Sequence, residues 1–158
     1  MESRTVIDFD ALAARIKAWG AELGFGKVDI AGVELGEDET RLLDWLRDGR
    51  HGTMDYMQHH GARRARPAAL EPGTLRVISA RMDYFPADAR EPWSVLGDPD
   101  RGSIARYALG RDYHKLVRTR LQKLADRIER EIGPFGYRAF ADSAPVLEKA
   151  LARDAGLG

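Results

Sequence analysis

The feature that most constrains this fold is a long stretch of apolar residues at helical spacing between Asp112 and the Gly133-Pro134 pair. The apolar positions recur every three or four residues and form one stripe, which consists of Tyr113, Leu116, Val117, Leu121, Leu124, Ile128 and Ile132. The opposite face is mostly charged. Because a helix of this kind must bury its apolar face against another layer, the rest of the chain has to supply that layer.

The spacing of apolar residues also predicts several shorter helices and strands. Their predicted ranges are helices at 8–23, 37–48 and 143 or 144–154, and strands at 25–33, 75–84 and about 136–141. Helices mixed with three short strands predict an α/β (α+β) class, a sandwich of a small mixed sheet with helices. The segments 51–74 and 85–102, rich in Gly, Pro and polar residues, are predicted to be long loops.

Length and composition narrow the function classes. Residues 1–158 are expected to form a single domain that buries roughly 70% of the surface of the unfolded chain. The chain has no cysteine, which excludes disulfides, thiolate metal sites and cysteine nucleophiles within it. Its 25 basic residues balance 25 acidic ones, so any polyanion site must be a local patch. We expect a cytoplasmic protein, because the sequence shows neither a secretory signal nor a membrane-spanning run.

The segment FADSAPVLEK carries a single carboxylate, Asp142, between a strand-like run and a predicted helix start. In one interpretation Ser143 caps the helix, Pro145 lies in its first turn, and Asp142 only adds negative charge at the positive helix end. In the other, Asp142 donates a proton, which requires burial or a neighbouring negative charge. The residues alone leave both interpretations open.

The segment YALGRDYHK places three proton-handling side chains, Asp112, Tyr113 and His114, at the start of the long helix. The alternative is that Asp112 caps the helix, Tyr113 lies in the core and His114 is solvated. Six Lys or Arg and one acid lie between Arg106 and Lys123, and a further basic cluster consists of Arg63, Arg64 and Arg66. These patches suit phosphate contact or a solvated helix face equally well.

The histidines at positions 51, 59 and 60 do not predict a metal site. They form no HExxH arrangement and have no cysteine partner, so zinc is not expected.

Four segments together resemble a known family: HGTMDYM, RARPAALEPGTLRVISARMDYFP, GSIARYALGRDYHK and DSAPVLEKALARDAGLG. They are similar to the N-terminal half of the epoxyqueuosine reductases. The resemblance implies a domain that binds cobalamin on a fold like that of reductive dehalogenases. It also implies a following domain with two 4Fe-4S clusters, and reduction of epoxyqueuosine to queuosine in the anticodon stem-loop of tRNA, the last step of queuosine synthesis.

The resemblance also assigns roles to residues. Asp142 corresponds to the acid that protonates the departing oxygen and to a residue of the cobalamin pocket. Asp112, Tyr113 and His114 line the same pocket, and Arg64 and Ala105 touch cobalamin; no residue of the chain is implied as a metal ligand. The sequence departs from the family at Arg66, where many members have an acid.

The resemblance implies further partners and one alternative. The chain ends at Gly158, where family members continue toward the cluster cysteines, so we expect it to bind cobalamin but not to reduce it alone. A separate electron donor and a monomeric state are expected for the full-length enzyme. The alternative function is a non-catalytic module of a truncated relative that binds cobalamin or RNA.

Overall fold

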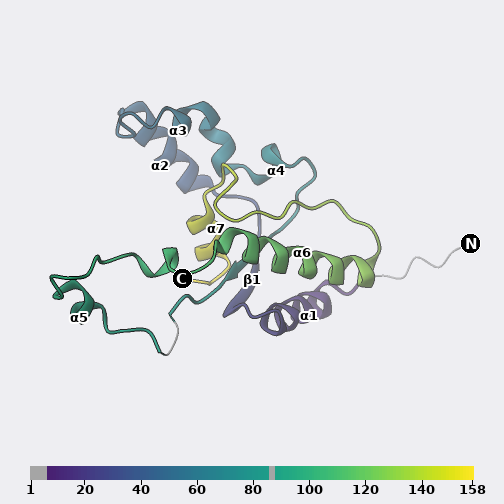
Figure 1. Ribbon diagram of the computed structural model, residues 1–158. Helices are drawn as coiled ribbons and strands as arrows, with labels where there is room; N and C mark the ends of the chain where they lie inside the picture. The colour runs from purple at the N-terminus through teal and green to yellow at the C-terminus, as the bar shows by residue number, and fades with distance from the viewer. Residues whose placement is uncertain (1–6, 86–87) are drawn as a thin grey trace, which may run out of the picture.

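The computed structural model describes residues 7–85 and 88–158 (Figure 1). Its elements in chain order are α1 (Phe9–Glu22), β1 (Lys27–Ala31), α2 (Gly36–Arg47), α3 (Asp55–His60), the 3-10 helix η1 (Gly61–Ala65), α4 (Pro67–Leu70), β2 (Val77–Arg81), α5 (Pro92–Leu96), the 3-10 helix η2 (Arg106–Ala108), α6 (Tyr113–Ile132) and α7 (Glu148–Asp154). The fold is a mixture of helices with a small sheet, as the sequence predicts.

The sheet consists of β1 and β2, paired antiparallel with Val28 opposite Ala80 and Ile30 opposite Ile78. Successive residues of a strand point to opposite faces, and the two faces are covered by different helices. On one face Val28 packs in a core with residues of α1 and α6, namely Leu12, Ile16, Leu124 and Ile128. On the other face, Ala31 and Val77 pack against α7 and the residues next to it. The sheet is therefore the middle of three layers, and it sets the position of α6 relative to α7.

Four predicted elements are confirmed with small shifts in their ends: α1, β1, α2 and β2 form within the predicted ranges 8–23, 25–33, 37–48 and 75–84 or within one residue of them. The long helix is confirmed as α6, and Asp112 caps it, because its side chain accepts a hydrogen bond from the backbone N–H of His114. Leu124 and Ile128 of its apolar stripe are buried.

The predicted strand at 136–141 is wrong. Within the described residues the sheet has two strands, both antiparallel, so the expected mixed sheet is not found either. Residues 136–141 form no ladder with β1 or β2, and Tyr137 is 40% exposed. A strand exists only through hydrogen bonds to a neighbour, so an extended segment without one remains a loop.

The predicted start of the last helix is also wrong. Helix α7 begins at Glu148 rather than at Ser143 or Ala144, and residues 142–147 form bends. Pro145 disfavours the helical conformation of Ala144, which precedes it. The N–H of Leu147 instead donates to the carbonyl oxygen of Arg64, at 2.9 Å.

The two predicted loops contain short helices. Helices α3, η1 and α4 lie within 51–74, and α5 lies within 85–102. Elements of this length show too few turns for an apolar period, and local contacts fix them: Pro67 and Pro92 start α4 and α5, and the side chain of Glu91 accepts a hydrogen bond from Ser94 N at 2.8 Å. Figure 1 shows α5 on an arm that extends away from the three layers.

One close contact between layers predicts a stability effect. Gly20 of α1 is buried against β1, and a Cβ atom there would lie 2.3 Å from Val28 Cγ2. We expect Gly20→Ala to lower the free energy of unfolding by about 1–3 kcal/mol, because the added methyl group overpacks the core. Chemical denaturation of Gly20→Ala and of the double variant Gly20→Ala/Val28→Ala measures the effect, and the double variant should recover part of the loss.

The matched control is Gly36→Ala, because a Cβ atom at Gly36 in α2 would meet nothing within 4 Å. A Gly20→Ala variant as stable as Gly36→Ala would contradict the packing of α1 on β1.

Candidate functional site

The site is built on a hydrogen bond between the start of α6 and the turn that leads to α7. Tyr113, the first residue of α6, donates its hydroxyl hydrogen to Asp142 Oδ2. Gly110, with φ of 88°, lets the chain turn just before the helix. The structure thus brings together two residues that lie 29 positions apart in the sequence.

His114 lies between two carboxylates. Its Nδ1 is 2.7 Å from Asp112 Oδ1, and its Nε2 is 3.8 Å from Asp142 Oδ2. The imidazole stacks on the Tyr113 ring with 4.2 Å between centroids, and the Tyr107 ring meets Tyr113 edge-on at 6.2 Å. Asp112, Tyr113, His114 and Asp142, which we call the acid cluster, are therefore one connected group. The interpretations of Tyr113 as a core residue and of Asp142 as a charge at a helix start are both wrong.

Hydrogen bonds fix the charge of two members of the acid cluster. The hydrogen bond to Asp142, together with burial and the charge of that carboxylate, raises the pKa of Tyr113 to about 12. Hydrogen bonds from the side chain and backbone of His114 hold the pKa of Asp112 below its ordinary value. At neutral pH, Tyr113 is therefore a phenol and Asp112 a carboxylate.

Glu148 is a member of the site that the sequence reasoning did not identify. Its Oε1 accepts a hydrogen bond from the backbone N–H of Asp142, at 3.3 Å. Burial raises the pKa of Glu148 and the nearby charge of Asp142 adds to this rise, while the hydrogen bond from Asp142 N–H opposes it. The only available signal was the six-residue spacing between Asp142 and Glu148, and the misplaced helix start gave that spacing no meaning.

Arg64 and Ala105 lie beside the acid cluster rather than within it. Arg64 donates to the carbonyl oxygen of Tyr56 at 2.9 Å, and its own carbonyl oxygen accepts from Leu147, the residue before Glu148. Its Nε is buried and has no hydrogen-bond partner among the described residues. Ala105 is exposed at the start of η2, two residues before Tyr107.

Arg66, the departure from the family pattern, has a partner of its own. Its guanidinium forms a bidentate pair with Glu39 of α2, with Nη2 2.6 Å from Oε1 and Nε 3.0 Å from Oε2. The pair holds the pKa of Glu39 below its ordinary value through that hydrogen bond. Arg66 therefore links η1 to α2.

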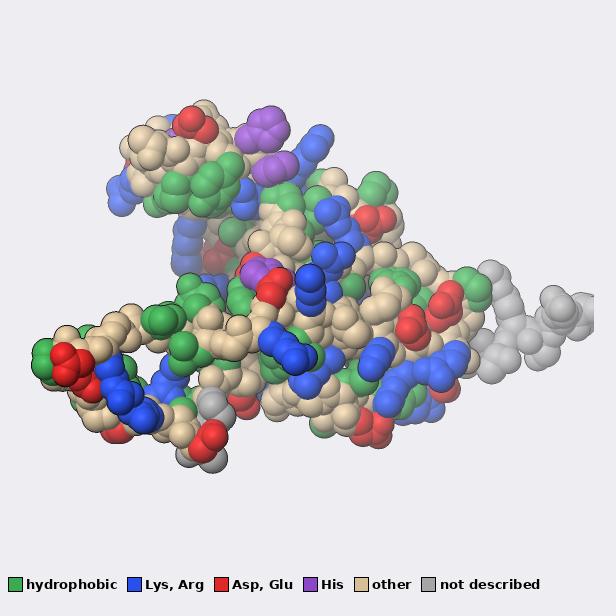
Figure 2. Space-filling view, in the orientation of Figure 1, with side chains coloured by type: hydrophobic (Ala, Val, Ile, Leu, Met, Phe, Trp, Pro, Cys, Tyr) green, Lys and Arg blue, Asp and Glu red, His purple; other side chains and the backbone are tan. Residues whose placement is uncertain are grey.

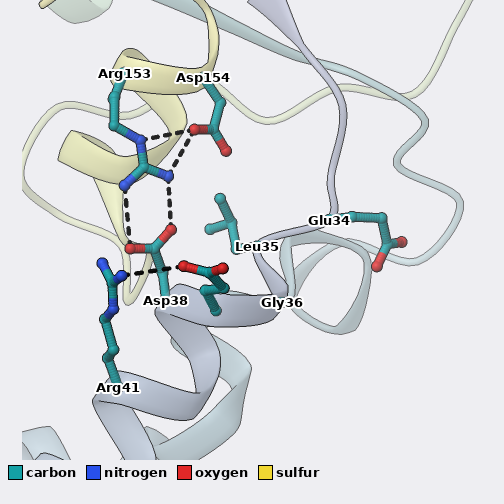
Figure 3. Close-up of a pocket in the computed structure, with 8 residues that line it drawn as sticks. Glu34, Leu35, Gly36, Asp38, Arg41, Arg153 and Asp154 are labelled. Carbon is teal, nitrogen blue, oxygen red and sulfur yellow. Dashed lines mark hydrogen bonds and ion pairs between the residues drawn. The ribbon is translucent and has the colours of Figure 1, made fainter.

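Two grooves border α7, and neither is lined by Tyr113 or His114. One, of about 330 Å³, contains Arg153, which pairs with Asp38 at 2.7 Å and with Asp154 at 2.6 Å (Figure 3). Both arginines that line this groove, Arg41 and Arg153, are engaged in ion pairs, and the Arg153–Asp38 pair links α7 to α2. The other, of about 710 Å³, lies between α2 and α7 and is lined by Leu42, Trp45, Leu147 and Glu148 among others. Glu148 therefore connects the acid cluster to an apolar groove.

Asp142 itself is open to solvent in this chain, with 52% of its side chain exposed, and His114 is 44% exposed. A donor of protons to a substrate needs a drier setting, so something must cover this face before the cluster can act as an acid. Figure 2 shows Lys and Arg side chains spread over the face formed by α1 and α6.

In residues 7–85 and 88–158, no group of three or more His, Asp or Glu side chains is placed to hold a metal ion. His59 and His60 meet edge-on at 5.1 Å, and burial lowers the pKa of His60. Over the same described residues, no helix combines the length and the apolar character needed to cross a bilayer.

The fold and the site define a mixed α/β domain whose exposed face joins a phenol, an imidazole and carboxyl groups. A family model described as "Epoxyqueuosine reductase QueG, DUF1730" matches residues 64–143, which include Arg64, Ala105 and the whole acid cluster. The chain belongs to the epoxyqueuosine reductase family.

Individual relatives agree. The chain is 64% identical over 147 residues to epoxyqueuosine reductase of Pseudomonas aeruginosa, covering 93% of this chain and 40% of that protein. It is 61% identical to the enzyme of Xanthomonas campestris pv. campestris, over 92% of this chain and 41% of the relative. A crystal structure of selenomethionine-labelled epoxyqueuosine reductase matches with a TM-score of 0.75 at 20% identity, over 96% of this chain and 40% of that chain. The chain thus spans about 40% of the length of these relatives.

The Tyr113–Asp142 contact predicts an unusual tyrosine. The chain has five tyrosines, and we expect Tyr113 to titrate with a pKa of about 12. In Asp142→Asn this pKa should fall toward the ordinary value of about 10, because the negative charge that disfavours phenolate is removed. Ring-carbon NMR shifts between pH 8 and pH 12.5 measure it, with far-ultraviolet circular dichroism to show that the chain stays folded.

Tyr84, which is 63% exposed, serves as the reference in the same spectra, assigned through Tyr84→Phe. If Tyr113 titrated together with Tyr84 in the wild type, the contact with Asp142 would be absent in solution.

Proposed function

We propose that this chain is the N-terminal cobalamin-binding domain of an epoxyqueuosine reductase, and that it faces the substrate, an epoxyqueuosine nucleotide in the anticodon stem-loop of tRNA. The observation that carries the proposal is the acid cluster, in which Tyr113 and His114 converge on Asp142. All of its members lie inside the segment matched by the family model. The reaction, the substrate and the cytoplasmic location belong to this proposal.

The residues beside the cluster suit a corrin in chemical terms. A corrin is a broad apolar ring with amide side chains at its edge, so its site needs apolar surface and hydrogen-bond donors. Arg64 Nε and Arg106 Nη1 are buried donors without a partner among the described residues. Three exposed apolar side chains lie near Ala105 in the sequence: Ile104, Tyr107 and Leu109. Arg64, Ala105 and the acid cluster would then hold the cofactor.

Removal of an epoxide oxygen as water consumes two electrons and two protons. Bound cobalamin would supply the electrons, received from 4Fe-4S clusters, for which this cysteine-free chain has no ligands. The chain's own contribution is the proton: the departing oxygen is a poor leaving group until it is protonated, and Asp142 is the acid that we assign to this step.

The other members of the cluster position Asp142. Tyr113 donates to Oδ2 and so leaves Oδ1 to carry the proton that is delivered. His114, fixed by Asp112 at 2.7 Å, keeps its Nε2 toward the same carboxyl group. A macrocycle and a nucleotide lying over this face would exclude water from the 52% of the Asp142 side chain that is now exposed.

Cobalamin binding tests the first half of the proposal. Cobalamin added to the purified chain should shift to the base-off absorption spectrum, and Arg64→Ala should weaken this binding because a donor to the corrin edge is lost. Arg63→Ala is the matched control, since Arg63 is the exposed neighbour of Arg64 in η1. An unchanged cobalamin spectrum at high micromolar protein would show that the chain does not bind cobalamin and would contradict the proposal.

The acid role is tested separately. In a full-length protein that contains this chain, Asp142→Asn should retain cobalamin and lose turnover by a factor of about 100 to 10,000, the usual contribution of a general acid. Asp10→Asn, on the exposed side of α1, is the control and should turn over normally. Full activity in Asp142→Asn would show that Asp142 is not the general acid.

A further inference from the structure

We propose that Glu148 is the positioning residue of the acid: it holds the backbone of Asp142 in place and shares a proton with the Asp142 carboxyl group. This inference rests on the proposed function for its role in turnover. It concerns a residue that lies outside the segment matched by the family model, 64–143.

The backbone of Asp142 has an unusual conformation. Its φ is 53°, the only positive value for a residue other than glycine within 7–85 and 88–158. This left-handed conformation is unfavourable for an ordinary residue, and it persists where the surroundings fix it. The fixing contact is the hydrogen bond from Asp142 N–H to Glu148 Oε1, at 3.3 Å.

Glu148 is held in place by the residues next to it. It is the first residue of α7, and the residue before it is held by the 2.9 Å hydrogen bond from Leu147 N–H to the Arg64 carbonyl oxygen. Leu151, one turn further along α7, is 3% exposed in a cluster with Leu35 and Ala65. The carboxyl group of Glu148 is thus presented to Asp142 by a helix that is anchored in the core.

Other charged side chains lie near Glu148, and most of them already have partners. The charged side chains that share its groove are Asp38, Arg41, Lys149 and Arg153. Arg153 is engaged by Asp38 and Asp154, and Arg41 pairs with Glu37 at 3.0 Å, while Lys149 is exposed. Asp142 is therefore the charged group that acts most directly on Glu148, in keeping with the raised pKa of Glu148.

Glu148 Oε1 reaches the backbone N–H of Asp142, so the two carboxyl groups are neighbours. Neighbouring carboxyl groups favour holding one proton between them, because both cannot easily be charged at once. When Asp142 gives its proton to the departing oxygen, it becomes a carboxylate. The pair then holds no proton, and Glu148 takes up a new one from water through the groove that it lines. Each turnover leaves the pair as it began.

A titration of the chain alone tests the pair without cobalamin or substrate. Side-chain carboxyl ¹³C shifts should show Glu148 titrating above the range of the other glutamates, with the exposed Glu129 of α6 as the internal reference. In Asp142→Asn the pKa of Glu148 should fall but stay above the ordinary value of a glutamate, because the burial remains. A wild-type Glu148 that titrates with Glu129 would overturn the inference.

Turnover in a full-length protein that contains this chain tests the role. Glu148→Gln keeps an acceptor for Asp142 N–H but carries no proton, and Glu148→Asp keeps a carboxyl group. Activity should decline as pH rises through the upper pKa of the pair, and in Glu148→Gln this decline should begin at lower pH. At pH values where activity has begun to decline in Glu148→Gln but not yet in the wild type, the loss relative to wild type should grow by about tenfold per pH unit. In Glu148→Asp the decline should begin at a pH between those of the other two proteins.

A merely structural role for Glu148 predicts a different result: Glu148→Gln would lose activity equally at every pH, and this outcome would contradict the shared proton. The two proposals also fail separately. If wild-type chain does not bind cobalamin while Glu148 still titrates high and responds to Asp142→Asn, the proposed function falls and the carboxyl pair remains.

Discussion

The contact on which the site depends is the hydrogen bond from Tyr113 to Asp142. It joins the first residue of α6 to the turn before α7, and those two helices lie on opposite faces of a two-stranded sheet. Burial of Leu124 and Ile128 fixes α6, and burial of Leu151 fixes α7. The position of Asp142 is therefore set by the core, although its side chain is 52% exposed.

The site works through a series of fixed polar contacts. Asp112 caps α6 and orients His114, while Tyr113 and His114 both face Asp142, and Glu148 accepts from the Asp142 backbone. Each contact restricts the next one, so that Asp142 is held in a left-handed conformation that it would not adopt alone. A ligand that covered this face would meet a carboxyl group whose position is set before binding, as the proposed role of general acid requires.

The sequence predicted the parts of this arrangement that follow from local pattern. The apolar period from Tyr113 to Ile132 is long enough to define a helix, and Asp112 is a suitable cap, so α6 and three of the four members of the acid cluster could be located. The start of α7 could not, because the effect of Pro145 on Ala144 and the tie from Leu147 to Arg64 outweigh a good capping residue at Ser143. Glu148 was missed for that reason, and the strand at 136–141 was wrongly predicted because no local pattern shows whether a neighbouring strand is present.

The central claim is that a corrin covers an acid whose position is fixed in advance, and a crystal structure of the chain with cobalamin tests it most directly. The account predicts the corrin over the face that carries Asp142, a polar group of its edge within hydrogen-bond distance of Arg64 Nε, and the Tyr113–Asp142 and Asp142–Glu148 contacts unchanged. A corrin bound elsewhere, or an Asp142 side chain turned to bulk solvent with Tyr113 unpaired beneath the corrin, would contradict it.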